Sequence, residues 1–267
     1  HYFVNVEFAR KREDSVPAFG ITGDPQSTAF YGTGGMGSLL LTMPGRTLAE
    51  ENGRSWTDEQ RNLVVMARVD WNINAEHRAT FRLNSQDYRG LNDIYAGSRR
   101  SDVAESGNST NKFKSLSGVM ELNSILGANL VNEVRVQGAK EERPTTPNST
   151  ICSPLRLHKL GSNYDVNAGQ YYIDPRTTEE KTLQIQDNLT YMSGDWTLKG
   201  GVDLQFIHMK NRYLPSGNGN WTFPSYDMAQ KWFSGGAAAD LSGVSYTQGY
   251  SPVDGVSDFS EKYFAGY

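Results

Sequence analysis

Strict alternation of apolar and polar residues over Arg61–Ile73 is the feature that most limits how this chain can fold. From Leu63 onward its odd positions are all apolar: Leu63, Val65, Ala67, Val69, Trp71 and Ile73. The even positions include two asparagines, an arginine and an aspartate. A two-residue period predicts a β-strand with one apolar and one polar face. About ten such residues, ending in an aromatic, is the length a tilted strand needs to cross the hydrocarbon of a bilayer.

Seven further segments complete a set of eight predicted strands, most of which show the same alternation. The predicted strands are Tyr2–Arg10, Arg61–Ile73, Arg78–Tyr88, Phe113–Ser124, Leu130–Ala139, Thr182–Met192, Trp196–Lys210 and a last one from about Lys262. We expect them to pair antiparallel in up-and-down order, with short helices at 47–52 and 226–233 and little other helix. The predicted fold class is therefore all-β, a transmembrane β-barrel segment that takes up residues 1–267 as one domain.

The connections between these strands alternate in length. Three are turns of about three residues, rich in the types that tight hairpins use: 74–76, 127–129 and 193–195. Four are long: 10–61, 89–112, 139–180 and 212–261. This asymmetry is typical of outer-membrane barrels, with short turns in the periplasm and long loops outside the cell. Trp71, Tyr191 and Trp196 lie on the apolar parity beside short turns, so we expect an aromatic girdle there.

The parity of each strand also predicts which residues face the barrel lumen. The lumen-facing candidates are Arg68, Asp70, Arg82, Glu133, Arg135, Lys199 and Asp203. These charges either contact a plug or a solute, or merely pair with one another across strands. The lipid-facing set includes Leu63, Val65, Val69, Leu198, Val202 and Leu204. Asp187 falls on the apolar parity, which predicts a bulge or a change of register in its strand.

Aromatic residues are frequent in the long connections. The recognition candidates are Tyr171, Tyr172, Trp221, Phe223 and Trp232. Loop aromatics provide large contact areas at a low entropic cost, which suits binding of a peptide, a glycan or a protein. The alternative is that they pack the long loops onto one another.

Composition argues against several other classes of protein. The net charge is −4 and there is no basic stripe, so we expect no nucleic-acid partner. The mean hydropathy is −0.58, and no apolar run is long enough for a transmembrane helix. Cys152 is the only cysteine, and the four histidines are scattered. We therefore expect no catalytic site, no metal site and no cofactor.

Five segments in order resemble Oar-like TonB-dependent outer-membrane receptors of the Bacteroidetes type. They are the aromatic-rich Tyr2–Glu7, Val69–Asn74, Asn132–Val136, Gly219–Phe223 with the helix that follows it, and Tyr263–Tyr267. The resemblance implies a barrel of about 22 strands that is filled by an N-terminal plug. It also implies import of a bulky solute, such as a peptide, glycan or chelate, with energy delivered through TonB.

Eight strands without a plug would then be an internal part of a longer receptor in the outer membrane of a Gram-negative bacterium. The partners implied are outer-membrane lipid, the rest of the barrel, the plug, TonB through the missing N-terminal part, and a surface lipoprotein. Two alternatives stay open. One is a complete eight-stranded barrel with a structural or adhesion role, and the other is a soluble β-rich binding module.

Overall fold

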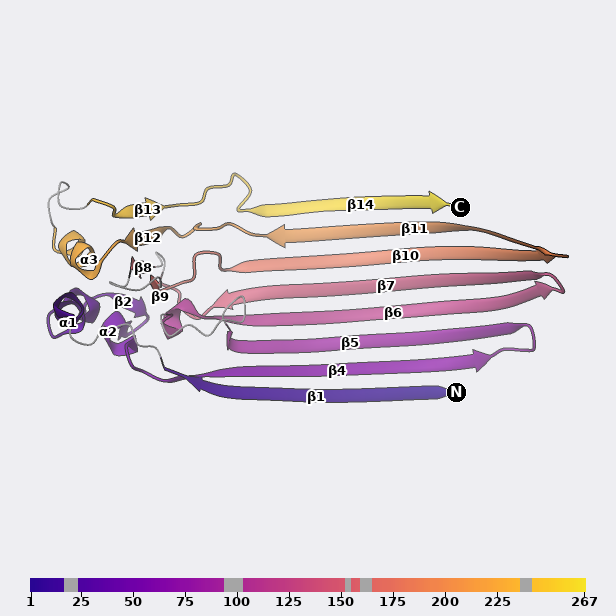
Figure 1. The fold of residues 1–267 in the computed structure, drawn as a ribbon, viewed down its shortest axis with the longest axis horizontal. Coiled ribbons are helices and arrows are strands. Elements are labelled where there is room, and N and C mark those ends of the chain that lie inside the picture. Colours follow the sequence, from indigo (N-terminus) through magenta and orange to yellow (C-terminus); the bar gives the residue numbers. More distant parts are fainter. Residues whose placement is uncertain (17–23, 94–102, 152–154, 159–164, 236–241) are drawn as a thin grey trace.

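A single antiparallel sheet of eight long strands dominates the computed structural model, which describes residues 1–16, 24–93, 103–151, 155–158, 165–235 and 242–267. Cys152 lies outside the described residues. The strands follow one another in the order of the chain, as Figure 1 shows. They are β1 (Tyr2–Ser15), β4 (Trp56–Asn72), β5 (His77–Asp93), β6 (Ser109–Gly127), β7 (Leu130–Pro147), β10 (Arg176–Ser193), β11 (Trp196–Arg212) and β14 (Val256–Gly266).

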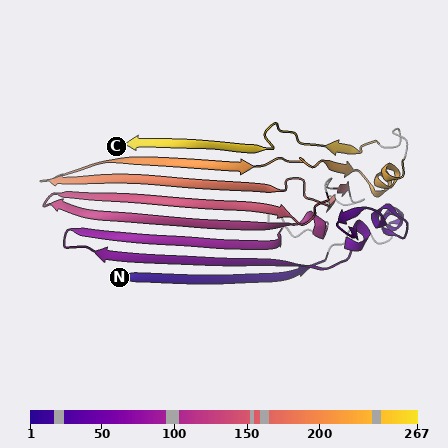
Figure 2. The same ribbon diagram turned by 180° about the vertical axis from the view of Figure 1, so that it is seen from behind.

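This arrangement confirms the predicted fold class and the up-and-down order of all eight strands. The sheet is not closed. Strands β1 and β14 lie at its opposite edges, and each has one neighbour in the sheet. Figures 1 and 2 show the two chain ends at these edges, both at the end of the sheet that carries the short turns.

Most strands are longer than predicted, and nearly all of the extra length lies toward the long connections. Strand β5 continues past Tyr88 to Asp93, and β7 continues past Ala139 to Pro147. The added residues are largely polar on both parities, for example Lys140 to Thr146. Alternation marks a strand only where its two faces meet different surroundings. The extensions are therefore strands with water on both sides, and a periodic pattern cannot find them.

The short turns are closed by local hydrogen bonds. In the β4–β5 turn, the side-chain oxygen of Asn74 accepts from the backbone N–H groups of Glu76 and His77 at 2.9 and 2.8 Å. In the β10–β11 turn, Gly194 has φ of 56°, a left-handed conformation that glycine adopts without strain. These turns fix the register of each hairpin.

The four long connections gather beyond the other end of the sheet into what we call the loop head, comprising the described parts of 16–55, 94–108, 148–175 and 213–255 (Figure 1). Its elements are α1 (Pro25–Tyr31), η1 (Met36–Ser38), β2 (Leu41–Met43), β3 (Arg46–Thr47), α2 (Leu48–Glu51), η2 (Glu105–Gly107), β8 (Leu155–His158), β9 (Asp165–Ala168), β12 (Asn220–Phe223), α3 (Tyr226–Phe233) and β13 (Ser245–Thr247). Strands β13, β12, β8 and β9 form a small sheet in that order.

Both predicted helices are present. The hydroxyl of Thr47 caps α2 in a reciprocal pair with Glu50, and Ser225 caps α3 by accepting from the N–H of Met228 at 3.2 Å. Helix α1 was not predicted, although Asp24 followed by Pro25 is a helix-start signal. No helix among the described residues is both long and apolar enough to cross a membrane.

The hydrophobic core lies in the loop head and not on the sheet. Its buried members come from all four connections: Phe30, Met36, Leu48, Ala104, Val166, Ala168, Phe223, Tyr226 and Ala229. On the eight long strands, by contrast, most of the large apolar side chains are exposed. An open sheet with an uncovered apolar face needs an apolar surrounding, which water does not provide.

Candidate functional site

The register of the sheet places the apolar residues of the alternating strands on one face. Val69 pairs with Tyr2 on one side and Phe81 on the other, and Leu204 pairs with Ile185 and Phe264. Directly paired residues share a face, so these rows continue from edge to edge. Trp71 and Trp196 are 56% and 75% exposed beside the short turns. The resulting surface is a continuous apolar band with aromatics toward one rim.

Asp187 is on this apolar face without the bulge or register change that we expected. It pairs with Val134 and Val202 in an uninterrupted ladder. Its carboxylate accepts a hydrogen bond from the side-chain amide of Asn132 at 2.5 Å, and Asn132 stands on the same face. The strand stays regular because a local amide donor satisfies the carboxylate on this face.

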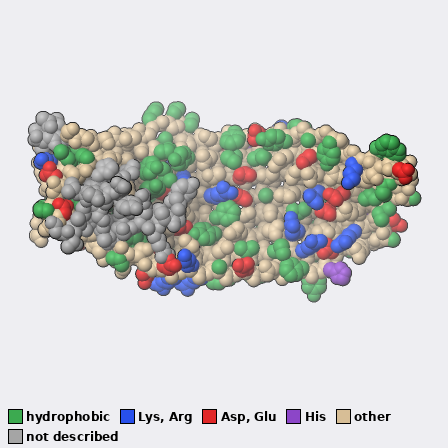
Figure 3. Space-filling model, in the orientation of Figure 1, with side chains coloured by type: hydrophobic (Ala, Val, Ile, Leu, Met, Phe, Trp, Pro, Cys, Tyr) green, Lys and Arg blue, Asp and Glu red, His purple; other side chains and the backbone are tan. Residues whose placement is uncertain are grey.

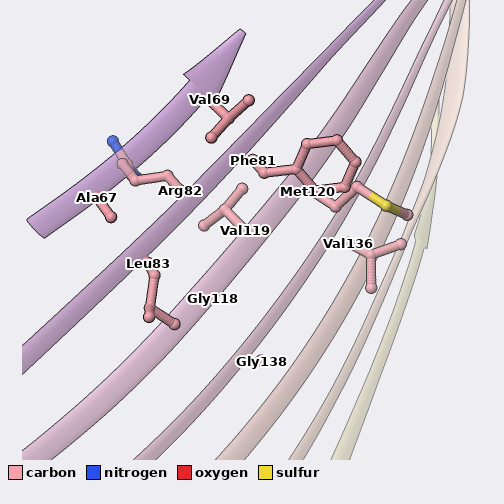
Figure 4. A pocket seen from close by; sticks show the side chains of 10 residues that line it. All are labelled: Ala67, Val69, Phe81, Arg82, Leu83, Gly118, Val119, Met120, Val136 and Gly138. Atoms are coloured by element: carbon pink, nitrogen blue, oxygen red, sulfur yellow. The ribbon is translucent and has the colours of Figure 1, made fainter. Parts of the chain in front are cut away.

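An apolar hollow of about 410 Å³ opens on the same face around Gly118 and Gly138, which pair across β6 and β7. Figure 4 shows Ala67, Leu83 and Val136 among the side chains around it. A Cβ atom at Gly138 would meet nothing within 4 Å, so the backbone does not require glycine there. The hollow therefore follows from the absence of a side chain at Gly138, and close packing of neighbouring atoms does not require glycine at that position.

The opposite face of the sheet is polar and carries all seven predicted lumen-facing residues. Figure 3 shows basic and acidic side chains interspersed over the strands on the face turned to the viewer. The register places Arg68 opposite Arg82, and Glu121 opposite Arg135. Asp203 pairs with Gln186, and Lys199 pairs with Thr190. The charges thus form adjoining rows across the strands.

Most of the described carboxylates on this face are held by specific donors. Arg68 donates to both oxygens of Asp70 at 3.0 and 2.9 Å, and Arg135 donates to Glu121 at 3.0 Å. Asp203 accepts from the amide groups of Gln184 and Gln186 at 2.7–3.0 Å. The contacts of Glu121 and Asp203 join neighbouring strands, whereas Arg68 and Asp70 lie two residues apart on β4.

The predicted recognition aromatics all lie in the loop head, on two of its connections. The rings of Tyr171 and Tyr172 meet edge to face with centroids 5.0 Å apart, and both side chains are half-buried. Trp221 is half-buried between Trp232 and Tyr246, with centroid distances of 4.8 and 4.7 Å. Tyr246 is 45% exposed. Together, Trp221, Trp232 and Tyr246 make a partly exposed aromatic cluster on β12, α3 and β13.

Phe223 differs from the other candidates because it is fully buried in the core of the head. It packs against Trp232 and Phe233, and no part of its ring reaches the surface. A contact residue for recognition must be exposed, so Phe223 serves to hold the loops together. Trp221 has the same parity in β12 and is only half-buried, so parity could not reveal the burial of Phe223, which arises from tertiary packing in the core of the head.

A buried polar tie that the sequence did not reveal joins three of the loops. Glu51 of α2 is 1% exposed and accepts hydrogen bonds from the hydroxyl and the N–H of Ser106 at 2.8 and 3.3 Å. The same hydroxyl accepts from the N–H of Gly169 at 2.9 Å. Burial raises the pKa of Glu51, and the two bonds from Ser106 oppose that shift. The tie fixes the first, second and third connections at one point.

Further polar contacts join the connections around this tie. Arg46 forms an ion pair with Glu105 at 2.5 Å, and the side-chain oxygen of Gln230 accepts from the N–H of Met36 at 2.9 Å. Asp174 is buried and accepts from the hydroxyl of Ser109; burial raises the pKa of Asp174. Among the described residues, no three His, Cys, Asp or Glu side chains are grouped to hold a metal ion.

Comparison with known proteins gave one match to a family and one to a solved structure. Residues 40–267 match a family model described as outer membrane beta barrel domain. The crystal structure of the outer membrane transporter YddB from Escherichia coli is similar with a TM-score of 0.48 and 8% sequence identity. That alignment covers 99% of this chain and 28% of the transporter chain. No curated protein matched the sequence.

Proposed function

This chain belongs to the outer membrane beta barrel domain family, and from that membership we propose that it is an internal part of the barrel of a TonB-dependent transporter. Proteins of this family lie in the outer membrane of Gram-negative bacteria, so the apolar face of the sheet meets lipid. Short turns then face the periplasm and the loop head lies outside the cell. The transported solute we propose is bulky: a peptide, a glycan or a chelate.

The open sheet is the observation that carries this proposal. The outer edges of β1 and β14 have no neighbour in the sheet. Backbone N–H and C=O groups without partners cost several kcal/mol each in hydrocarbon, so a barrel must close. Further strands that belong to the remainder of the barrel would pair with these edges, as in a larger barrel of about 22 strands.

The polar face would then line the lumen and meet a plug. Charges of both signs, which already pair with one another across strands, suit a wet interior that a folded plug contacts. The remaining proposed partners are TonB, which would act through the plug, and a surface lipoprotein above the head. We also propose that the protein has no enzymatic activity, in keeping with its place in a family of outer membrane beta barrel domains.

Recognition is proposed for the exposed part of the loop head. Tyr171, Tyr172, Trp221 and Trp232 are partly exposed aromatics on two connections, and aromatic residues dominate binding sites in which water is excluded. The test is growth on panels of peptides, glycans and metal chelates with the full-length receptor. Tyr171→Ala, Tyr172→Ala and Trp221→Ala should abolish growth on one class while the folded barrel is retained. Unchanged growth would move recognition to another part of the receptor.

TonB dependence is tested separately. The full-length protein should bind the purified periplasmic domain of TonB, and uptake should stop in a strain that lacks TonB. A structure of the full-length protein decides between this proposal and the small barrel. More than eight strands around a plug supports a transporter, whereas a barrel closed by β1 pairing with β14 would identify a complete eight-stranded protein.

A further inference from the structure

Two arginines stand directly opposite each other on the polar face of the sheet. Arg68 of β4 and Arg82 of β5 are a paired position in the ladder, and both side chains lie on the same face. They border a hollow of about 300 Å³ that is also lined by Thr80, Glu121, Arg135 and Gln137. Like charges at directly opposed positions destabilise a sheet, so this pair needs a compensating negative charge.

The carboxylates near the hollow are already engaged. Asp70 takes two hydrogen bonds from Arg68 and a third from the hydroxyl of Thr80 at 2.8 Å. Glu121 takes one from Arg135 at 3.0 Å and another from Asn123 at 2.8 Å. Of the carboxylates in the described part of the chain, none lies within ion-pair distance of Arg82. Arg82 is therefore the surplus cation of the hollow.

We propose that this hollow binds an oxyanion, a carboxylate or a phosphate, with Arg82 as its principal contact. A guanidinium presents two parallel N–H donors that match two oxygens of such a group, which gives strong and directional bonds. The amide of Gln137, on the same row of the ladder, adds a further donor. The inference deepens the proposed function, since it requires that the polar face line the barrel interior.

Two sources can supply the same chemistry. A carboxylate of the plug would hold the plug in place, whereas a phosphate or carboxylate on the solute would bind here during transport.

The experiment uses purified full-length receptor in detergent and compares the native protein with Arg82→Gln and with Arg78→Gln. Arg78 is the matched control, because it lies four residues away on the same face of the same strand. Its guanidinium lies 3.5 Å from Asp70, outside the hollow.

The thermal midpoint is measured in rising sodium phosphate at constant ionic strength. If the hollow is open to solutes, phosphate raises the midpoint of the native protein and of Arg78→Gln, and Arg82→Gln loses this rise. If a plug carboxylate fills the hollow, phosphate has no effect. Arg82→Gln then lowers the midpoint more than Arg78→Gln and makes the plug more susceptible to protease.

Two results would overturn the proposal. One is a phosphate effect that both variants lose equally, which indicates a general positive field. The other is no phosphate effect together with equal midpoints for the two variants. Neither result depends on TonB binding or uptake. A negative phosphate titration therefore leaves the transporter proposal standing, and a negative TonB or uptake experiment leaves the phosphate titration valid.

Discussion

Asp187 illustrates how a single residue can break the pattern of a strand without breaking the strand. Its carboxylate lies on the apolar face of the sheet and accepts a hydrogen bond from the side-chain amide of Asn132. We expect Asn132→Val to cost about 1–3 kcal/mol, because it leaves the carboxylate without its donor. Asn132→Val with Asp187→Val should recover most of that loss, since replacing both partners by apolar groups is nearly neutral. Urea unfolding in lipid vesicles measures both, and additive losses would contradict this account.

Glu51 gives a second prediction at the residue scale, which concerns pH. Its folded pKa is raised by burial, so its contribution to stability is fully present below the unfolded pKa of about 4.3 and is lost as pH rises through the folded pKa. Glu51→Gln keeps the contact with Ser106 and cannot ionise. From about pH 4 to about pH 7, the loop head of the variant should gain protection from hydrogen exchange relative to the native head. Equal pH slopes in the two proteins would show that Glu51 does not titrate there.

At the scale of elements, the alternation itself makes a testable prediction about where the bilayer ends. Nitroxide labels on β4 from Leu63 to Trp71 should alternate between contact with oxygen in lipid and contact with a water-soluble nickel reagent. We expect the alternation to fade over Thr57–Gln60, the part of β4 nearest the loop head, where both faces of the strand should meet water. Continued alternation through Thr57 would mean that the bilayer covers the whole strand.

The same boundary explains how much of the fold could be predicted from the sequence. Most of the eight long strands could be predicted because an apolar surrounding on one face and water on the other impose a period of two. Their outer halves, such as Lys140–Pro147, have polar surroundings on both sides and show no period. The core of the head could not be predicted, because Phe30, Leu48, Val166 and Phe223 meet only through tertiary packing. Helix α3 was predicted because its cap is local to Ser225.

At the scale of the whole molecule, the head is held by its own hydrophobic core, whereas the sheet should be held by its hydrogen-bond ladder and by lipid. We therefore expect the two parts to respond separately to substitution. Phe223→Ala should destabilise the head by about 3–5 kcal/mol, since it opens a cavity in the shared core. The strands should remain folded, because lipid and the hydrogen-bond ladder hold them. Protease cleavage within the loops should rise while the slow gel migration of the unheated barrel is unchanged. Tyr250→Ala, at a residue that is 89% exposed, is the control and should change neither. If Phe223→Ala increased loop cleavage and also abolished the slow gel migration, head and sheet would not respond separately.

The core of the loop head joins segments that are far apart in the sequence, which bears on the order in which the chain should fold. The hydroxyl of Tyr31 contacts that of Tyr226 across 195 residues of sequence, and Met36 contacts Gln230 across 194. The three hairpins β4–β5, β6–β7 and β10–β11, by contrast, close through turns of a few residues. Contacts between distant segments form slowly, because their loop-closure entropy is lost before the contacts compensate for it. We therefore expect the hairpins to assemble first and the head to condense only after its four segments have been brought together. On heating, the head should open before the strands separate.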